Sequence, residues 1–400
     1  MDGIERLRTV ITWRPVRIAY PISAWLGCGR AARGPTGSTS TWISPTTSPT
    51  LNGDKTMKIS RKHFLGAIAG AAALAFSPGA LAQNVTLRFH QMLPPQATIP
   101  AKAIAAWSKR VEDESGGRIK IQRFDAMALG GRPAELYDQA KDGVVDLMWT
   151  VLGYTPGRFP KTEAFELPFL VGSAEAGSKA FQEYVEKHAL DEFKDVKLIA
   201  VHVHGPGLIH SKTPVTKLED LKGMKVRGGS RVINIMLEQL GASPVGMPVP
   251  AVGEALSKGV ISATTIPWEV TPSLKVQQIV KNHTGFSGTR GLYTQTFAVA
   301  MNRESYDKLP PDLKKVIDVN SGQTIAALFG RAMDEGDKVG LDLARKAGNN
   351  IVTLDAVETN RWQRAAAGVR AVWYAELGAK GIDGPKLVAE VEALIAKYAK

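Results

Sequence analysis

The chain has almost no cysteine: Cys28 is the only one in 400 residues. It lies in a segment, residues 1–56, that is rich in Ser, Thr, Pro and Gly and shows no hydrophobic period that could build a core. We expect this extension to be disordered or never translated. The rest of the chain then has no cysteine, which excludes disulfides, thiolate metal sites and cysteine nucleophiles. The fold must therefore depend on its hydrophobic core.

The apolar run at residues 64–76 is too short to span a bilayer, since it has about 13 residues and a spanning helix needs ~20. It follows Met57 and a few basic residues, and it precedes Ala80-Leu81-Ala82, which matches a small-x-small cleavage site. Residues 57–82 are therefore predicted to be a signal peptide cleaved after Ala82. The mature protein is expected to be periplasmic and not itself membrane-spanning, with a permanent anchor as the alternative.

The positive charge of the chain comes largely from these first segments. Ten of the 50 Lys and Arg residues and three of the 38 Asp and Glu residues precede residue 83, which leaves 40 basic against 35 acidic residues. The net charge falls from +12 to +5, and no later stretch clusters basic with aromatic residues. A nucleic-acid partner is therefore not expected.

Motifs for catalysis, metals and cofactors are missing as well. His202 and His204 share one face of a predicted strand, but no third ligand accompanies them. There is no His-Glu-x-x-His, Walker loop, Rossmann glycine fingerprint or nucleophile elbow. We predict a protein that is not an enzyme and holds no metal and no cofactor.

Strand and helix patterns alternate through the rest of the chain, which predicts an α/β fold. The expected strands are 85–89, 119–121, 144–151, 196–203, 224–227, 261–266 and 293–301. The expected helices are 99–111, 132–141, 173–188, 232–240 and 251–258. The 318 residues that follow the signal peptide are enough for two domains.

A long helix is expected near the carboxyl end, because residues 311–348 have no internal proline and carry an apolar stripe. The stripe consists of Ile325, Leu328, Phe329, Ala332, Met333, Gly336, Val339, Gly340 and Leu343. A continuous helix of this length would measure on the order of 50 Å, more than one small domain, so it would bridge both domains. A partner interface is the alternative use of the stripe.

The strand that ends at Arg227 carries the candidate binding residue. Gly228-Gly229-Ser230 follow it and open a predicted helix with Ser230 as its N-cap. Ligands of α/β proteins bind at the carboxyl ends of strands, where a guanidinium can hold a carboxylate with two charge-assisted hydrogen bonds. A surface ion pair with Glu219 or Asp220 is the alternative role of Arg227.

Several ordered motifs resemble one family: Leu-Glu-Asp-Leu-Lys-Gly-Met-Lys-Val-Arg at 218–227, Leu-Gly-Ala-Ser-Pro at 240–244 and Leu-Pro-Pro-Asp-Leu-Lys at 309–314. With the signal peptide and the long helix, they are similar to periplasmic solute receptors of tripartite ATP-independent periplasmic (TRAP) transporters, of the dicarboxylate-receptor type. The resemblance covers roughly 84–395. It implies a two-domain periplasmic-binding-protein-like fold with a long helix spanning both domains, a carboxylate held by Arg227, and TRAP membrane subunits as partners.

The domain boundaries that we predict follow from this order of elements. The first domain is expected to comprise 83–204 with 297–325. The second is expected to comprise 205–296 with 326–400, including the bridging helix and the C-terminal helices.

Departures from the family pattern concern the ligand. The second basic residue of sialic-acid-type relatives is absent from His204-Gly205-Pro206-Gly207, and Pro267-Trp268-Glu269 stand where those relatives have an Asn. Aromatic side chains offer apolar contact area with few polar tips, which favours a small acid with an apolar or aromatic body, such as a 2-hydroxy, 2-keto or aromatic acid, over a sugar acid. The predicted ligand-binding residues are Arg227, Trp268, Tyr154, Trp149 and Gln91.

The predicted function is thus a periplasmic solute receptor that delivers a small carboxylate to a TRAP transporter. A periplasmic enzyme acting on an organic acid is one alternative, with Arg227 as the substrate clamp and a histidine such as His210 as the base. A ligand receptor that serves a sensor kinase is another alternative.

Overall fold

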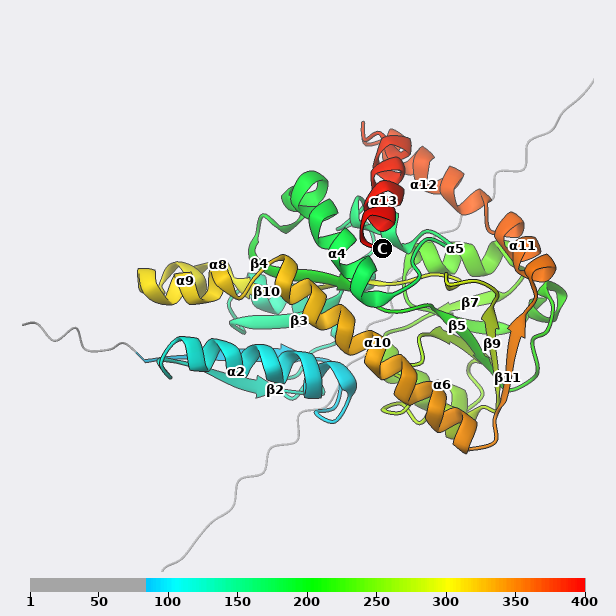
Figure 1. Ribbon diagram of the computed structural model, residues 1–400, viewed down its shortest axis with the longest axis horizontal. Coiled ribbons are helices and arrows are strands. Elements are labelled where there is room, and N and C mark those ends of the chain that lie inside the picture. The colour runs from blue at the N-terminus through cyan, green and yellow to red at the C-terminus, as the bar shows by residue number, and fades with distance from the viewer. Residues whose placement is uncertain (1–83, 400) are drawn as a thin grey trace, which may run out of the picture. The chain divides into compact units, whose positions relative to one another are not determined.

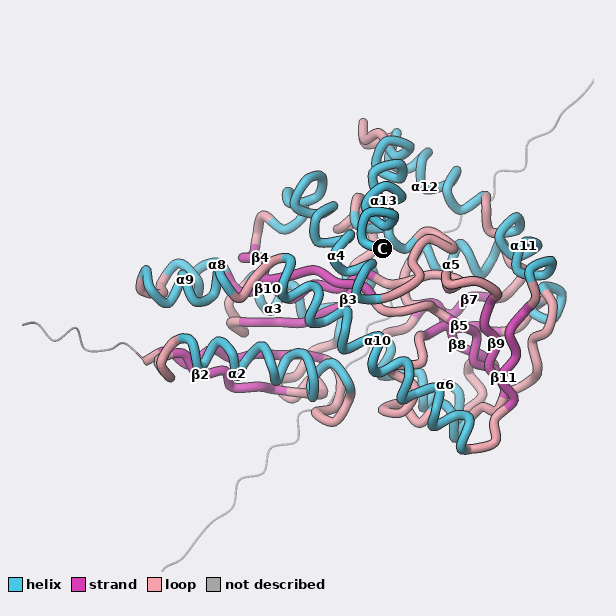
Figure 2. Tube along the Cα trace, in the orientation of Figure 1, coloured by secondary structure: helices cyan, strands magenta, loops and turns pink. Residues whose placement is uncertain are grey.

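The strands of the chain form two separate sheets, which the computed structural model describes together with their helices over residues 84–399 (Figure 1). The predicted extension 1–56 and the predicted signal peptide 57–82 lie outside these residues, so both stay predictions. Helices and strands alternate along the described chain (Figure 2), which confirms the expected α/β class.

The first sheet has five strands, and it takes its fourth strand from far along the chain. Their spatial order is β2 (Ile119–Phe124), β1 (Val85–Gln91), β3 (Leu147–Val151), β10 (Thr296–Asn302) and β4 (Val196–Val203). β1 is parallel to β2 and β3, whereas β10 is antiparallel to β3 and β4. All residues of β3 and β10 are buried, as expected for central strands covered on both faces.

The second sheet has six strands, of mixed direction. Their spatial order is β11 (Asn350–Leu354), β9 (Asn282–Phe286), β5 (Leu208–Ser211), β8 (Ala263–Ile266), β6 (Lys225–Gly228) and β7 (Ser243–Gly246). β6 lies parallel between β8 and β7, so its carboxyl end stands beside theirs. The sequence patterns predicted β6 and β8 but not β5, β7, β9 or β11.

The helices that cover these sheets have the following bounds: α2 Ala105–Glu114, α3 Leu136–Lys141, α4 Ala174–Tyr184, α5 Arg231–Gln239, α6 Val252–Ser257, α7 Val276–Ile279, α8 Arg303–Asp307, α9 Pro311–Val319, α10 Gln323–Lys346, α11 Ala356–Ala365, α12 Gly368–Gly378 and α13 Gly384–Tyr398. None of the helices within residues 84–399 is both long and apolar enough to cross a membrane.

The long helix is shorter than predicted, because the chain breaks between α9 and α10. Gly322 has a φ of 73°, which no helix interior adopts, and its N–H donates to the Ile199 carbonyl of β4 at 2.7 Å. α10 therefore starts at Gln323 and has 24 residues, about 36 Å at 1.5 Å per residue. It still runs past both sheets, as Figure 1 shows, which confirms the predicted bridging helix.

The predicted apolar stripe of α10 is correct except at two positions in its second half. Ile325, Phe329 and Met333 are buried, but Val339 and Leu343 are 57% and 39% exposed. The later turns bury small residues instead, at Gly340 and Ala344, together with Gly336, where the helix approaches the segment after β8. Gly336 and Gly340 belong to the predicted stripe and are buried, whereas Val339 and Leu343 were misjudged, because hydrophobicity alone does not indicate where backbones need to pass closely.

The predicted domain boundaries stay a prediction. The strands divide between the sheets near residue 204 and again near residue 296. The last helix, α13, packs against α4, where Lys397 pairs with Glu183 at 2.7 Å.

Candidate functional site

An enclosed cavity of about 30 Å³ lies between the two sheets. One water molecule needs roughly 10–15 Å³, so the space exceeds that of a single water. Residues from β3, β4, β8, β10 and α10, or from the loops beside them, form its wall. They are Leu93, Trp149, Val151, Tyr154, His204, Val249, Ile266, Pro267, Glu269, Val270, Gln295, Phe297 and Met333.

A stack of flat rings forms one side of this cavity. The Trp149 and Phe297 rings are 5.4 Å apart at an angle of 2°, and His202 stacks on Phe297 at 4.7 Å. The indole Nε1 of Trp149 donates to His202 Nε2 at 2.8 Å, so this histidine is neutral, and burial lowers its pKa to about 3. The wall is therefore rigid and apolar, and it suits a flat apolar group.

Arg227 is fully buried and is not one of the residues that line this cavity, but its charge acts on two of them, Tyr154 and His204. It is the third residue of β6, and the helix that follows begins at Ser230, whose hydroxyl accepts from the Ile233 N–H as the predicted N-cap. The guanidinium donates from Nε to the Met247 carbonyl at 2.9 Å and from Nη1 to the Thr265 carbonyl at 3.2 Å. Both bonds fix its orientation.

Within residues 84–399, Arg227 has no carboxylate partner. Asp220 instead accepts from Thr216, and Glu219 pairs with Arg361, so the ion pair considered as an alternative is absent from the described residues. The Nη2 atom of Arg227 is buried without any hydrogen-bond partner there. A buried charge without a counter-charge is unfavourable, so the site is suited to an anion.

Two residues of the cavity wall lie near this guanidinium. Burial raises the pKa of Tyr154 and the Arg227 charge opposes this rise, while the Tyr154 hydroxyl accepts from the Val249 N–H at 2.8 Å. His204 Nδ1 lies 2.6 Å from the Gly205 carbonyl and so carries the proton, which leaves Nε2 without a partner in the described chain. Burial, and to a smaller extent the Arg227 charge, lowers the pKa of His204 to about 3. The histidine is therefore neutral and adds no positive charge.

Gln295 lies directly above Gly229, two residues beyond Arg227. A Cβ atom on Gly229 would lie 2.3 Å from Gln295 Oε1 and 2.4 Å from Nε2, so only glycine leaves room for the amide. Gln295 lines the cavity, and its Nε2 has no partner among residues 84–399. The amide is available to a bound anion.

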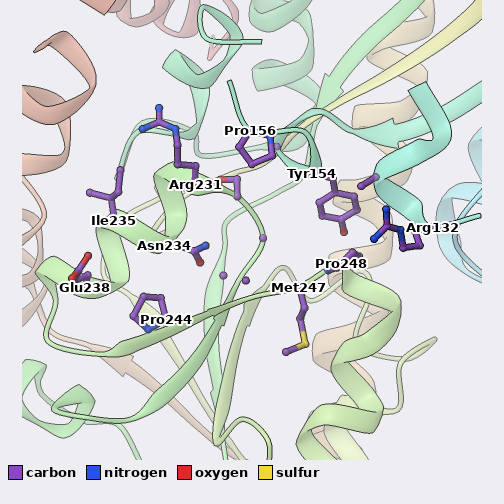
Figure 3. Close-up of a pocket in the computed structure, with 16 residues that line it drawn as sticks. Arg132, Tyr154, Pro156, Arg231, Asn234, Ile235, Glu238, Pro244, Met247 and Pro248 are labelled. Carbon is purple, nitrogen blue, oxygen red and sulfur yellow. The ribbon is translucent and has the colours of Figure 1, made fainter. Parts of the chain in front are cut away.

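Tyr154 also borders a second, open space. A groove of about 600 Å³ lies beside the start of α5, lined on one side by Arg132 and Tyr154 and on the other by α5 and residues 244–248. Figure 3 shows the Tyr154 ring beside Arg132 and above Pro248, with Met247 below. Because Tyr154 lines the groove and the cavity, it separates the cavity from the more open space.

The structure places only part of the predicted site together. Trp149 and Tyr154 line the cavity, and Arg227 contacts Tyr154. Trp268 instead packs between the second sheet and α10, with its ring 4.9 Å from His210 and 4.8 Å from His283. It is therefore behind the cavity wall and not in it.

Gln91 does not line the cavity either. Its Oε1 accepts from the Leu93 N–H at 2.5 Å, and its Nε2 donates to Asp125 at 2.8 Å and to the Leu93 carbonyl at 2.5 Å. The amide is thus engaged within the protein, and it positions Leu93, which does line the cavity.

The candidate base of the enzyme alternative, His210, also lies outside the cavity. Its Nδ1 is 2.7 Å from His283 Nδ1, and its Nε2 is 3.2 Å from the Ile266 carbonyl. Sequence reasoning missed Gln295 and Phe297 as cavity residues. Phe297 is in β10 and Gln295 directly precedes that strand, where the chain returns from the second sheet to the first, and only that return could have indicated them.

Buried ionisable groups make the stability of this fold depend on pH in two opposite ways. Burial raises the pKa of Glu166 and Glu269 to about 7 and that of Glu192 to about 8. Burial lowers the pKa of His202, His204 and His210 to about 3 and that of His283 to about 4.

We expect the melting temperature to peak near pH 6–7. A carboxyl with a raised pKa contributes stability that is lost as pH rises from ~4.5 through its folded value. A histidine with a lowered pKa contributes stability that is lost as pH falls below ~6.5. Calorimetric melting from pH 4 to pH 9 should show both losses, and Glu192→Gln should weaken the alkaline loss. A higher melting temperature at pH 9 than at pH 6.5 would contradict this account.

Two sheets linked by a bridging helix, with a cavity between them and a buried, unpaired arginine beside it, define a solute-binding class of protein. The family model of bacterial extracellular solute-binding protein family 7, DctP, matches residues 89–376. The chain therefore belongs to this family, whose members include the TRAP solute-binding proteins.

Solved structures of relatives agree with this membership. A TRAP solute-binding protein from Rhodoferax ferrireducens T118, in complex with copurified benzoate, is 47% identical, with a TM-score of 0.78 over 79% of this chain and 99% of that one. A marine metagenome protein specific for aromatic acids, with 3-hydroxybenzoate, is 48% identical, with a TM-score of 0.78 over 80% and 100%. A Bordetella bronchiseptica protein with bound mandelate is 32% identical, with a TM-score of 0.72 over 78% and 99%.

Proposed function

We propose that this protein is a periplasmic receptor that captures a small aromatic monocarboxylic acid and delivers it to the membrane subunits of a TRAP transporter. The observation that carries the proposal is the buried guanidinium of Arg227, which has no carboxylate partner within residues 84–399. The ligand carboxylate supplies the missing counter-charge, with Gln295 as a further donor.

The apolar wall supports an aromatic body for the ligand. The Trp149 and Phe297 rings present a flat surface, and the cavity has few polar groups. A sugar acid would leave several hydroxyl groups without partners against this wall, which is unfavourable. The aromatic acids in the related structures agree with this chemistry.

Titration calorimetry with four compounds tests the proposal. Benzoate should bind, whereas benzamide, which has nearly the same shape without the charge, should bind at least tenfold more weakly. Succinate and gluconate should also bind weakly. Equal affinity for benzoate and benzamide, or preferred binding of gluconate, would overturn the proposal. Mass spectrometry of the bound acid after long incubation should find it unchanged, which separates a receptor from an enzyme.

We further propose that the protein is exported and cleaved after Ala82. The basis is the run of basic, apolar and small residues within 57–82. The intact mass of the protein purified from the periplasm should correspond to a chain that starts at Gln83. A mass that includes residues 1–56 would contradict both the cleavage and the expected absence of this extension.

A further inference from the structure

The acidic residue on the cavity wall, Glu269, has no role in holding a carboxylate, because both groups are acids. Yet it is 3% exposed, lines the cavity, and has an Oε1 atom without a hydrogen-bond partner among residues 84–399. Glu269 forms no ion pair with Arg227 within residues 84–399. Within residues 84–399, the cavity wall thus carries an unpartnered carboxyl oxygen in addition to the unpartnered amide nitrogen of Gln295.

Other buried acids near this point are engaged with the backbone. Asp334 accepts from the Ala174 and Glu175 N–H groups at 2.7 and 2.9 Å, and Asp337 accepts from the Glu269 N–H at 2.7 Å. No backbone N–H of the described chain bonds to the Glu269 carboxyl, and the neighbouring Thr98 hydroxyl donates to the Glu269 backbone carbonyl at 3.5 Å. The difference indicates that this carboxyl is not a structural cap.

Its position is nevertheless fixed. Asp337 of α10 holds the Glu269 backbone, and the Glu269 side chain passes over Gly336, where a Cβ atom would lie 2.6 Å from Glu269 Cγ. Thr98 borders the same space, at 2.9 Å from that Cβ position. A side chain positioned in advance by its neighbours is what a specific binding contact requires.

We propose that Glu269 is a specificity residue of the cavity, whose carboxyl forms a hydrogen bond with a hydroxyl group on the ring of the bound acid. This inference rests on the proposed function and names the substrate class more closely, as ring-hydroxylated aromatic acids. A ligand hydroxyl can donate and accept, and it satisfies a buried oxygen that otherwise has no partner.

The protonation of Glu269 agrees with this role. Burial raises its pKa to about 7, so near neutral pH a large share of the carboxyl groups carry a proton and can also donate. A neutral carboxyl does not repel an acid bound to Arg227, whereas a charged one would.

Calorimetry with benzoate, the ortho, meta and para hydroxybenzoates and the matching fluorobenzoates tests the inference. At least one hydroxybenzoate should bind the wild-type protein about 2–10-fold more tightly than benzoate, as a neutral hydrogen bond allows. The fluorobenzoate of that isomer should gain nothing, because it fills similar space without a hydroxyl. Failure of every hydroxyl isomer to exceed benzoate and its fluoro analogue would overturn the inference without any variant.

Variants then assign the effect to Glu269. Glu269→Leu should lose the preference for the hydroxybenzoate over benzoate, measured as the ratio of the two affinities within the same variant, whereas Glu269→Gln should keep most of that preference. Glu304→Leu is the matched control, at an exposed acid of α8 that pairs with Lys308. It should change neither the affinity for benzoate nor the preference for the hydroxybenzoate. A hydroxyl preference that persists in folded Glu269→Leu would overturn the inference. If no aromatic acid bound the wild-type protein, the proposed function would fail instead, so the two failures can be distinguished.

Discussion

Replacing Arg227 with lysine is expected to weaken binding of the aromatic acid by about ten- to a hundredfold while the protein remains folded. Lysine keeps the charge, but its compact ammonium cannot form two parallel hydrogen bonds with a carboxylate and is more strongly hydrated. It also cannot keep both backbone contacts, to Met247 and Thr265, while facing the ligand. Losing one charge-assisted hydrogen bond costs roughly 1.5–3 kcal/mol, which gives the stated range.

Arg227→Ala should weaken binding further, because the ligand carboxylate is then buried without a counter-charge. Titration calorimetry measures both effects, and melting curves show whether each variant is folded. The control is Arg345→Lys, at an exposed arginine in the last turn of α10, which should bind like wild type. If Arg227→Lys bound within twofold of wild type at an unchanged melting temperature, Arg227 would not hold the carboxylate.

Gly340→Ala is expected to destabilise the protein by about 1–3 kcal/mol, although the same change usually stabilises an exposed helix. The added Cβ would lie 2.1 Å from the Trp268 carbonyl oxygen and 2.7 Å from its carbon, which are backbone atoms that cannot rotate away. That oxygen accepts from the Thr271 N–H and hydroxyl, at 3.1 and 2.8 Å, so moving it also breaks a turn. The melting temperature should fall by about 2–5 °C.

Affinity for the acid should fall in Gly340→Ala as well, because the displaced segment carries Pro267 and Glu269, which line the cavity. Gly378→Ala is the matched control: this glycine is in α12, and a Cβ there would meet no atom within 4 Å. The control should melt at the wild-type temperature or slightly above it. Identical melting of Gly340→Ala and Gly378→Ala would show that α10 can move away from Trp268 without loss.

The choice between Trp268 and Glu269 shows why part of the site could not be predicted. The two residues are adjacent in the turn that follows β8, and the turn directs their side chains to different surroundings. Sequence reasoning selected the tryptophan, because aromatic side chains often line ligand sites. The structure places the tryptophan against His210 and His283, and it is the glutamate that lines the cavity.

Local patterns sufficed wherever neighbours in the chain decide the outcome. Short stretches of sequence predict a strand that ends near Arg227, an N-cap at Ser230 and a fully buried strand β3, and the structure has all three, with β6 ending one residue later at Gly228. The order of strands and helices likewise determined the α/β class, because hydrophobic period depends on residues a few positions apart.

Tertiary structure decided what depends on residues far apart in the chain. Gln295 and Phe297 come to the cavity because β10 crosses back into the first sheet between β3 and β4. The break before α10 arises where Gly322 meets Ile199 of β4. The missing partner of the buried Arg227 could likewise be recognised only after the fold had placed Glu219 and Asp220 elsewhere. A sequence lists charges, but only packing decides which of them are buried and which are paired.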